Sequence, residues 1–202
     1  MRGLLNYNIA AFESNNYYGF PEISPYTDHV KCDSWIDFDT ARSKRDRSCK
    51  GVHFFEDDYK FNSIWEFPQR YIKFLSSYNY VIGTDFSLYF DFPISLQIYN
   101  KYRNHWLSAY LSVNGIDIIP NISLSTPDCY DWSFLGYPIG SVVAFSDIGC
   151  IRDRSCREIL FKAYDEMIRR LSPRQVLYFT RSKRYAPSEA DIITIPFLKG
   201  GN

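Results

Sequence analysis

The pattern that most constrains the fold is an alternation of short β-type runs with helical segments. The runs are rich in β-branched and aromatic residues and lie at 52–55, 80–82, 116–122, 141–145 and 175–179. They follow one another at intervals of about 25 to 36 residues, which leaves room for the crossover helix that parallel pairing requires. We therefore expect an α/β fold with a mainly parallel sheet of five or six strands. An incomplete TIM-like barrel is favoured, and a doubly wound three-layer sandwich is the alternative.

The segments between these runs carry helix signals. Pro93 stands where a helix can begin without losing a hydrogen bond, and Gly115 can end that helix. In the last helical segment, Ser155 and Glu158 have capping-box spacing ahead of a repeat of 3.6 residues. A final apolar run at 192–197 follows the fifth strand too closely for a crossover helix. We expect that run to form an antiparallel edge or to close the sheet.

The chain has 202 residues, enough for one packed core, and we expect a single domain over residues 1–202. Residues 1–50 are rich in Asn, Tyr, Ser and Pro and lack periodicity, so they predict an irregular N-terminal segment packed on an α/β core over 51–202. Lys and Arg total 23, as do Asp and Glu, which excludes a strongly basic chain that coats nucleic acid. Only local nucleic-acid contact is left open, at the basic stretches 42–50 and 181–184.

The chain contains no apolar stretch near the ~20 residues of a membrane span. At the N-terminus only Leu4 and Leu5 precede the polar Asn6, so no signal-peptide core is present. Five cysteines at irregular spacing predict reduced thiols rather than a disulfide framework. We therefore expect a cytoplasmic protein with no membrane partner.

Polar residues gather directly after the predicted strands. In a parallel α/β sheet, ligands bind at this carboxyl edge, because the loops and helix N-termini converge there. The predicted catalytic residues, acting as acid–base groups or as ligands of Mg²⁺ or Mn²⁺, are Asp57, Asp58, Asp85 and Asp147. The predicted ligand-binding residues, with the two arginines neutralising phosphate, are Ser87, Tyr89, Asp91, Arg103, Asn121, Ser146 and Arg152. The competing interpretation is that Asp and Ser merely cap helices and form turns.

Two His/Cys couples have spacings found in small zinc sites, His29 with Cys32 and Cys49 with His53. If the four side chains met, zinc would staple the N-terminal segment. His53 also lies inside the first predicted strand, where a core histidine is the simpler interpretation.

Two stretches, GVHFFEDDYKF at 51–61 and GTDFSLY at 83–89, carry a family resemblance. Together with the pair Tyr102-Arg103 and the segment 119–121, they resemble a domain family of unknown function found in bacteria, phages and other mobile elements. The resemblance covers roughly residues 51–180. It implies a phage or mobile-element setting and favours the first three predicted carboxylates and Ser87 as site residues, but it implies no particular reaction.

Two functions from different classes follow. The first is an enzyme that acts on a nucleotide or nucleic-acid substrate through the strand-end carboxylates, with or without a divalent metal. The second is a non-catalytic module that sequesters a nucleotide signal or other phosphorylated small molecule, or that inhibits a host protein.

Overall fold

The computed structural model describes residues 12–44 and 49–195, and every strand pairing within them is parallel. One sheet has four strands, in the order β1 (Trp35–Asp37), β2 (Gly51–His53), β3 (Tyr80–Ile82) and β4 (Ile118–Ile119). The other has three, in the order β5 (Val142–Ser146), β6 (Gln175–Thr180) and β7 (Asp191–Thr194). The α/β class and the parallel sheet are confirmed.

The two sheets join through a single bridge between Asn121 and Ala144. The Ala144 amide donates to Pro120 O at 2.8 Å, and the Ile122 amide donates to Ala144 O at 2.9 Å. The strands therefore follow one another in chain order from β1 to β7, which is the order of a barrel and not of a doubly wound sheet. Among the described residues β1 and β7 do not pair, so the barrel is not closed.

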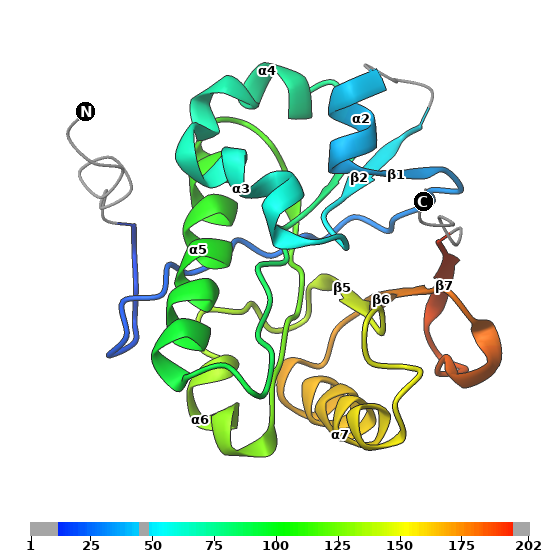
Figure 1. Ribbon diagram of the computed structural model, residues 1–202. Helices are drawn as coiled ribbons and strands as arrows, with labels where there is room; N and C mark the ends of the chain where they lie inside the picture. The colour runs from blue at the N-terminus through cyan, green and yellow to red at the C-terminus, as the bar shows by residue number, and fades with distance from the viewer. Residues whose placement is uncertain (1–11, 45–48, 196–202) are drawn as a thin grey trace.

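Helices cover the outer face of the curved sheet (Figure 1). They are α2 (Phe38–Lys44), α3 (Asp58–Glu66), α4 (Ile72–Leu75), α5 (Ile94–Val113), α6 (Tyr130–Ser133) and α7 (Arg154–Leu171), with 3-10 turns η1 (Pro68–Arg70), η2 (Pro127–Cys129) and η3 (Lys183–Tyr185). One apolar cluster packs the helices α2 to α5 on β1 to β4, and a second packs α7 on β5 and β6. None of the helices in the described ranges combines the length and the apolar character that a bilayer span needs.

The inner face of the sheet is filled by a third apolar cluster. Ile82, Ala144, Leu177 and Phe179 belong to it and come from both sheets. The ring of Phe179 lies 5.2 Å from the ring of Trp35, centroid to centroid. The interior is therefore a packed core, and the cavity described below lies at the carboxyl ends of the strands.

The structure corrects the expectation for residues 1–50. Residues 35–44 form β1 and α2, so irregular structure was the wrong prediction there. Trp35 packs directly over Gly51 of β2, where any Cβ would clash with the indole ring. A three-residue strand is too short to show the period-two pattern by which strands are recognised.

Two further expectations change. β7 pairs with β6 in parallel, so the predicted antiparallel edge is wrong, and the short η3 turn takes the place of a full crossover helix. The N-cap of α7 is Asp153, whose carboxylate accepts from the Cys156 amide at 2.8 Å. Ser155 lies inside the helix and is not the cap.

Candidate functional site

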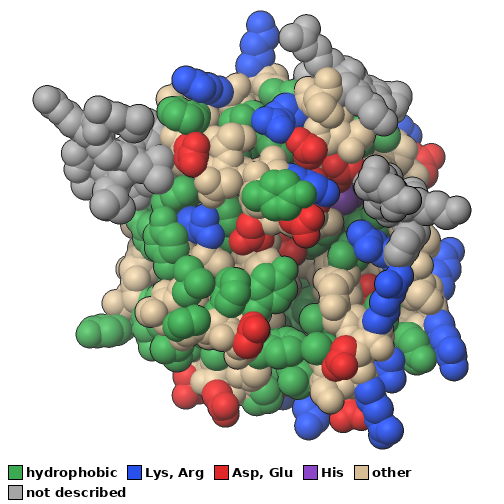
Figure 2. Space-filling view, viewed as in Figure 1, with side chains coloured by type: hydrophobic (Ala, Val, Ile, Leu, Met, Phe, Trp, Pro, Cys, Tyr) green, Lys and Arg blue, Asp and Glu red, His purple; other side chains and the backbone are tan. Residues whose placement is uncertain are grey.

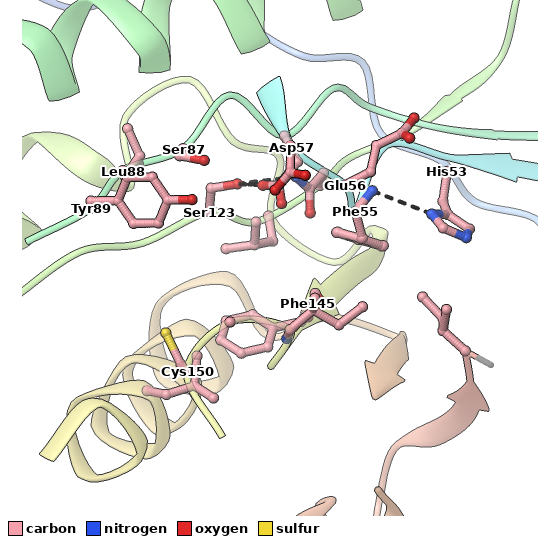
Figure 3. Close-up of a pocket in the computed structure, with 18 of the residues that line it drawn as sticks. His53, Phe55, Glu56, Asp57, Ser87, Leu88, Tyr89, Ser123, Phe145 and Cys150 are labelled. Atoms are coloured by element: carbon pink, nitrogen blue, oxygen red, sulfur yellow. Dashed lines mark hydrogen bonds between the residues drawn. The ribbon is translucent and has the colours of Figure 1, made fainter. Parts of the chain in front are cut away.

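A cavity of about 780 Å³ opens at the carboxyl ends of the strands (Figure 3). It is lined by the residues of β1, by residues at or after the ends of the strands β2 to β7, and by the start of α7. The carboxyl edge is therefore the concave face of the molecule, as the strand-end pattern predicts.

Asp85 is the best-held carboxylate in this pocket. Its Oδ1 accepts a hydrogen bond from Asn121 Nδ2 at 2.8 Å and a second, short one from Ser123 Oγ. Burial raises the pKa of Asp85; the hydrogen bonds from Ser123 and Asn121 oppose that rise, and the charge of Asp58 adds to it. The group combines a fixed orientation with a pKa moved toward neutrality, which is the combination that proton transfer at neutral pH requires.

The loop that carries Asp85 has no strand partner beyond β3, so side chains satisfy its backbone. Asn104 Oδ1 accepts from the Phe86 amide at 2.8 Å and from Thr84 Oγ1 at 3.0 Å. Asp58 Oδ1 accepts from Ser87 Oγ at 2.8 Å. Asp58 and Ser87 thus tie the start of α3 to this loop; Ser87 lines the cavity, whereas Asp58 does not.

Two more carboxylates enter the lining after β2, Glu56 and Asp57. Asp57 is exposed over 66% of its side chain and lies 3.8 Å from Lys60 Nζ. Glu56 Oε1 accepts from the Asp39 amide at 3.0 Å, while its Oε2 is buried without a partner. Burial raises the pKa of Glu56 to about 7, with the nearby charge of Asp37 adding to the effect of burial.

Asp147 does not join the others. It is fully buried, its Oδ2 accepts from Thr180 Oγ1 at 2.7 Å, and it is absent from the cavity lining. Its side chain lies in the layer beneath α7, on the side of β5 that carries Val143. The prediction that Asp147 meets the other carboxylates is therefore wrong, because side chains alternate between the two faces of a strand.

Some of the predicted ligand-binding residues line the cavity, and others do not. Tyr89, Asp91, Asn121 and Ser146 line the cavity with Ser87. Arg152 is exposed outside the lining.

Arg103 does not reach the cavity. Its guanidinium lies 3.6 Å from the ring centroid of Phe86 and donates to Asn62 Oδ1 at 3.3 Å. It packs the α3–α5 interface and does not face a phosphate in this pocket.

The proposed zinc ligands are not brought together. His29 is exposed, and Cys32 Sγ donates to Ser34 O at 3.3 Å. His53 is buried in β2, its Nδ1 accepts from the Phe55 amide at 3.3 Å, and burial lowers the pKa of His53 to about 4. Within residues 12–44 and 49–195, no three His, Cys, Asp or Glu side chains, Cys49 included, are grouped so as to hold a metal ion.

A buried polar network behind Asp85 escaped the sequence reasoning. Tyr137 Oη donates to Asn121 O at 2.8 Å and accepts from the Ser123 amide at 3.3 Å. Lys101 Nζ lies 3.5 Å from the centroid of the Tyr137 ring and 2.6 Å from His105 Nε2. Burial holds the pKa of Lys101 and of His105 well below the usual values. The only signal in the sequence was polar residues on the inward side of a long helix.

The chain is similar to a known domain family and to two phage proteins. The family described as "Domain of unknown function (DUF4417)" matches residues 12–197. The Gene 1 protein of Mycobacterium phage L5 is 33% identical over 171 residues, which cover 83% of this chain and 73% of that protein. The Gene 1 protein of Mycobacterium phage D29 is 34% identical over 175 residues, which cover 84% of this chain and 63%, less than two thirds, of that protein. No solved structure matches. The family match begins at residue 12, so it includes most of the segment before residue 51. The resemblance noted in the sequence begins only at residue 51.

Proposed function

The chain belongs to the DUF4417 family of unknown function, which includes mycobacteriophage gene 1 proteins, and from this premise we propose that it is an enzyme that acts on a nucleotide unit through Asp85. The observation that carries the proposal is the hydrogen-bonded Asp85 carboxylate, with its raised pKa, in a cavity that two further carboxylates from β2 also line. Perturbed carboxyl groups that converge in a concave site are the usual mark of acid–base catalysis.

Hydrolysis is the reaction that this arrangement supports best. Asn121 and Ser123 both donate to Asp85, so they favour its ionised form and fix the direction of its free lone pairs. In the proposed step an ionised Asp85 takes a proton from an attacking water while the oxygen of that water bonds to the phosphorus of the substrate and the bond from phosphorus to the leaving oxygen breaks. The leaving oxygen keeps the electron pair of that bond and takes a proton from the solvent. Asp57, on the neighbouring strand end, is the second carboxylate that a bound substrate meets.

The rest of the lining suits a nucleotide. Tyr89 and Phe90 offer exposed aromatic surface for a base, and Lys60 and Arg181 also line the cavity and carry the charge that attracts phosphate. The volume lies within the range of small-molecule sites.

The assay compares turnover with and without a divalent metal ion. Carboxylate oxygens are the ligands that Mg²⁺ and Mn²⁺ prefer, and Asp57 and Asp85 are the residues that would supply them. The described residues hold no group of three such side chains, so we assign no ion to the mechanism. We also propose that the protein acts in the host cytoplasm, since its five cysteines are unpaired.

The test is turnover on a panel of nucleoside mono-, di- and triphosphates and short oligonucleotides, with Mg²⁺, with Mn²⁺ and with EDTA. We expect Asp85→Asn to lower turnover about 100-fold or more while the melting temperature stays near that of the wild type. Asp128→Asn, at an exposed position of η2 outside the cavity lining, is the matched control and leaves turnover unchanged. A wild-type protein that turns over no member of the panel under any of the three conditions contradicts the proposal.

The second candidate is a module that binds a nucleotide or a host protein without turnover. The exposed aromatic side chains of Tyr89 and Phe90 at the cavity favour it, because aromatic residues dominate binding energy at protein interfaces. Saturable binding of a panel nucleotide by a wild type that shows no turnover selects this candidate.

A further inference from the structure

The mouth of the cavity has two unlike rims. The aromatic rim consists of Tyr89 and Phe90, which line the cavity and are 53% and 38% exposed, and of Tyr59, which is 77% exposed and lies next in the chain to the lining residue Lys60. Tyr59 begins α3 and the other two lie in the β3–α5 loop; the hydrogen bond between Asp58 and Ser87 joins these two segments. Figure 2 shows hydrophobic side chains gathered on this part of the surface.

The basic rim lies across the cavity, on the β5–α7 loop and the β6–β7 connection. Its exposed members are Arg152, Arg154, Arg181, Lys183 and Arg184. Arg157 joins its two segments, because its guanidinium lies 4.5 Å from the ring centroid of Tyr185 in η3. Figure 1 places the β6–β7 connection on the far side of the sheet from α5, and Figure 2 shows Lys and Arg side chains gathered there.

The charges of the rim and of the cavity oppose one another. Residues 150–160 and 180–186 together hold six basic side chains and two acidic ones. The cavity lining holds five carboxylates and two basic side chains. A single strand that lies along the basic rim keeps most of its negative charge away from these carboxylates and brings only one nucleotide close to them.

We propose that the ligand is a single-stranded nucleic acid that lies across the cavity mouth, with its phosphates on the basic rim and unpaired bases on the aromatic rim. Base–aromatic stacking combined with a basic track is the usual way in which proteins hold single strands. Stacking on exposed rings requires unpaired bases, so a duplex is a poorer ligand. The inference rests on the proposed function only in that the nucleotide inserted between the rims is the one that Asp85 acts on.

The test is fluorescence anisotropy with a labelled 12-nucleotide single strand of mixed sequence, as DNA and as RNA, in a series of salt concentrations. We expect binding at low salt that weakens as salt rises, because cations are released from the phosphates. Arg181→Gln combined with Arg184→Gln is expected to weaken binding about tenfold or more at low salt and to flatten the salt dependence by about one to two in slope. Tyr89→Ala is expected to weaken binding about tenfold with the salt slope unchanged.

Matched controls exist on other parts of the surface. Lys73→Gln combined with Lys162→Gln removes two exposed charges outside both rims, and Tyr17→Ala removes a tyrosine that is 98% exposed away from the cavity lining. Both leave binding within twofold of the wild type. Binding of the single strand by a wild type that turns over no oligonucleotide separates this inference from the catalytic proposal, since the rims do not depend on turnover. The inference is overturned if the wild type binds neither strand at low salt, if the duplex binds as tightly as the single strand, or if a host-cell protein is retained while the oligonucleotides are not.

Discussion

After β3, the Asp85 carboxylate faces the cavity, whereas after β5 the Asp147 carboxylate faces the layer under α7. Both are acidic residues that follow a parallel strand, and burial raises the pKa of both. Their neighbours differ: two donors from the β4 end hold Asp85 at the surface of the cavity, while Thr180 of β6 holds Asp147 inside the fold. The β1–β4 half of the fold therefore turns a carboxylate toward the cavity, and the β5–β7 half uses a similar group internally.

The difference arises from register. β5 keeps its regular alternation through its last residue, and the Asp147 amide still donates to Phe179 O at 3.1 Å. Asp147 therefore shares a face with Val143, which packs in the cluster under α7, while Ser146 shares the inner face with Ala144. The chain after β3 leaves the strand pattern, so the direction of Asp85 is set by hydrogen bonds and not by alternation. An acidic residue after a strand faces the cavity only when the local path of the backbone turns it there.

The largest expected effect concerns the residue that joins the two halves. Phe179 of β6 lies 4.7 Å from the ring of Phe55 and 5.5 Å from the ring of His53, centroid to centroid. We expect Phe179→Ala to lower the free energy of unfolding by about 3–5 kcal/mol, measured by urea denaturation. Phe90→Ala, at a partly exposed ring, is the control and costs less than about 1 kcal/mol. A cost at Phe179 no greater than that of the control means that the halves do not depend on each other.

The second prediction compares the two carboxylates directly. Asp85→Asn is expected to reduce turnover by about 100-fold, whereas Asp147→Asn stays within a few-fold of the wild type because it does not line the cavity. The asparagine at 147 keeps an acceptor for Thr180, so the melting temperature also stays close to that of the wild type. Equal losses of turnover at the two positions remove the functional distinction between the halves.

The third prediction uses pH. The pKa of Glu56 rises from 4.5 to about 7 on folding, so the folded protein holds this proton more tightly than the unfolded chain does. Stability from this group is greatest below pH 4.5 and is lost as the pH rises through about 7. We expect Glu56→Gln to gain about 1–2 kcal/mol relative to the wild type between pH 5 and pH 8, with solvent screening of this partly exposed group taken into account. Glu158→Gln, on the exposed surface of α7, shows no such gain in melting curves over that range.

The smallest effect is expected where the two sheets meet. Tyr137→Phe removes the hydroxyl that bonds to Asn121 O and to the Ser123 amide. We expect a loss of about 1 kcal/mol in the free energy of unfolding, measured against Tyr17→Phe, whose exposed hydroxyl costs nothing measurable. A neutral Tyr137→Phe means that this hydroxyl does not help to hold the segment after β4.

Much of the carboxyl edge followed from the sequence. Asp57, Asp85 and Asn121 line one cavity, because parallel strands bring their ends to one edge whatever the details of packing. The four proposed zinc ligands are not grouped among the described residues, because spacing along the chain says nothing about distances between elements. His53 is buried in β2, and burial lowers its pKa to about 4. β1 went unrecognised because three residues carry too little periodicity, so Asp37, which also lines the cavity, was not considered.

The sequence alone determined the alternation of strands and helices from β2 to β6, the parallel pairing of those strands and the edge on which polar groups gather, because hydrophobic periodicity and crossover length are local properties of the chain. The tertiary structure decided which polar groups reach the cavity. Whether a side chain faces ligand or core depends on backbone direction and on partners distant in sequence, such as Asn121 and Ser123 for Asp85 and Thr180 for Asp147.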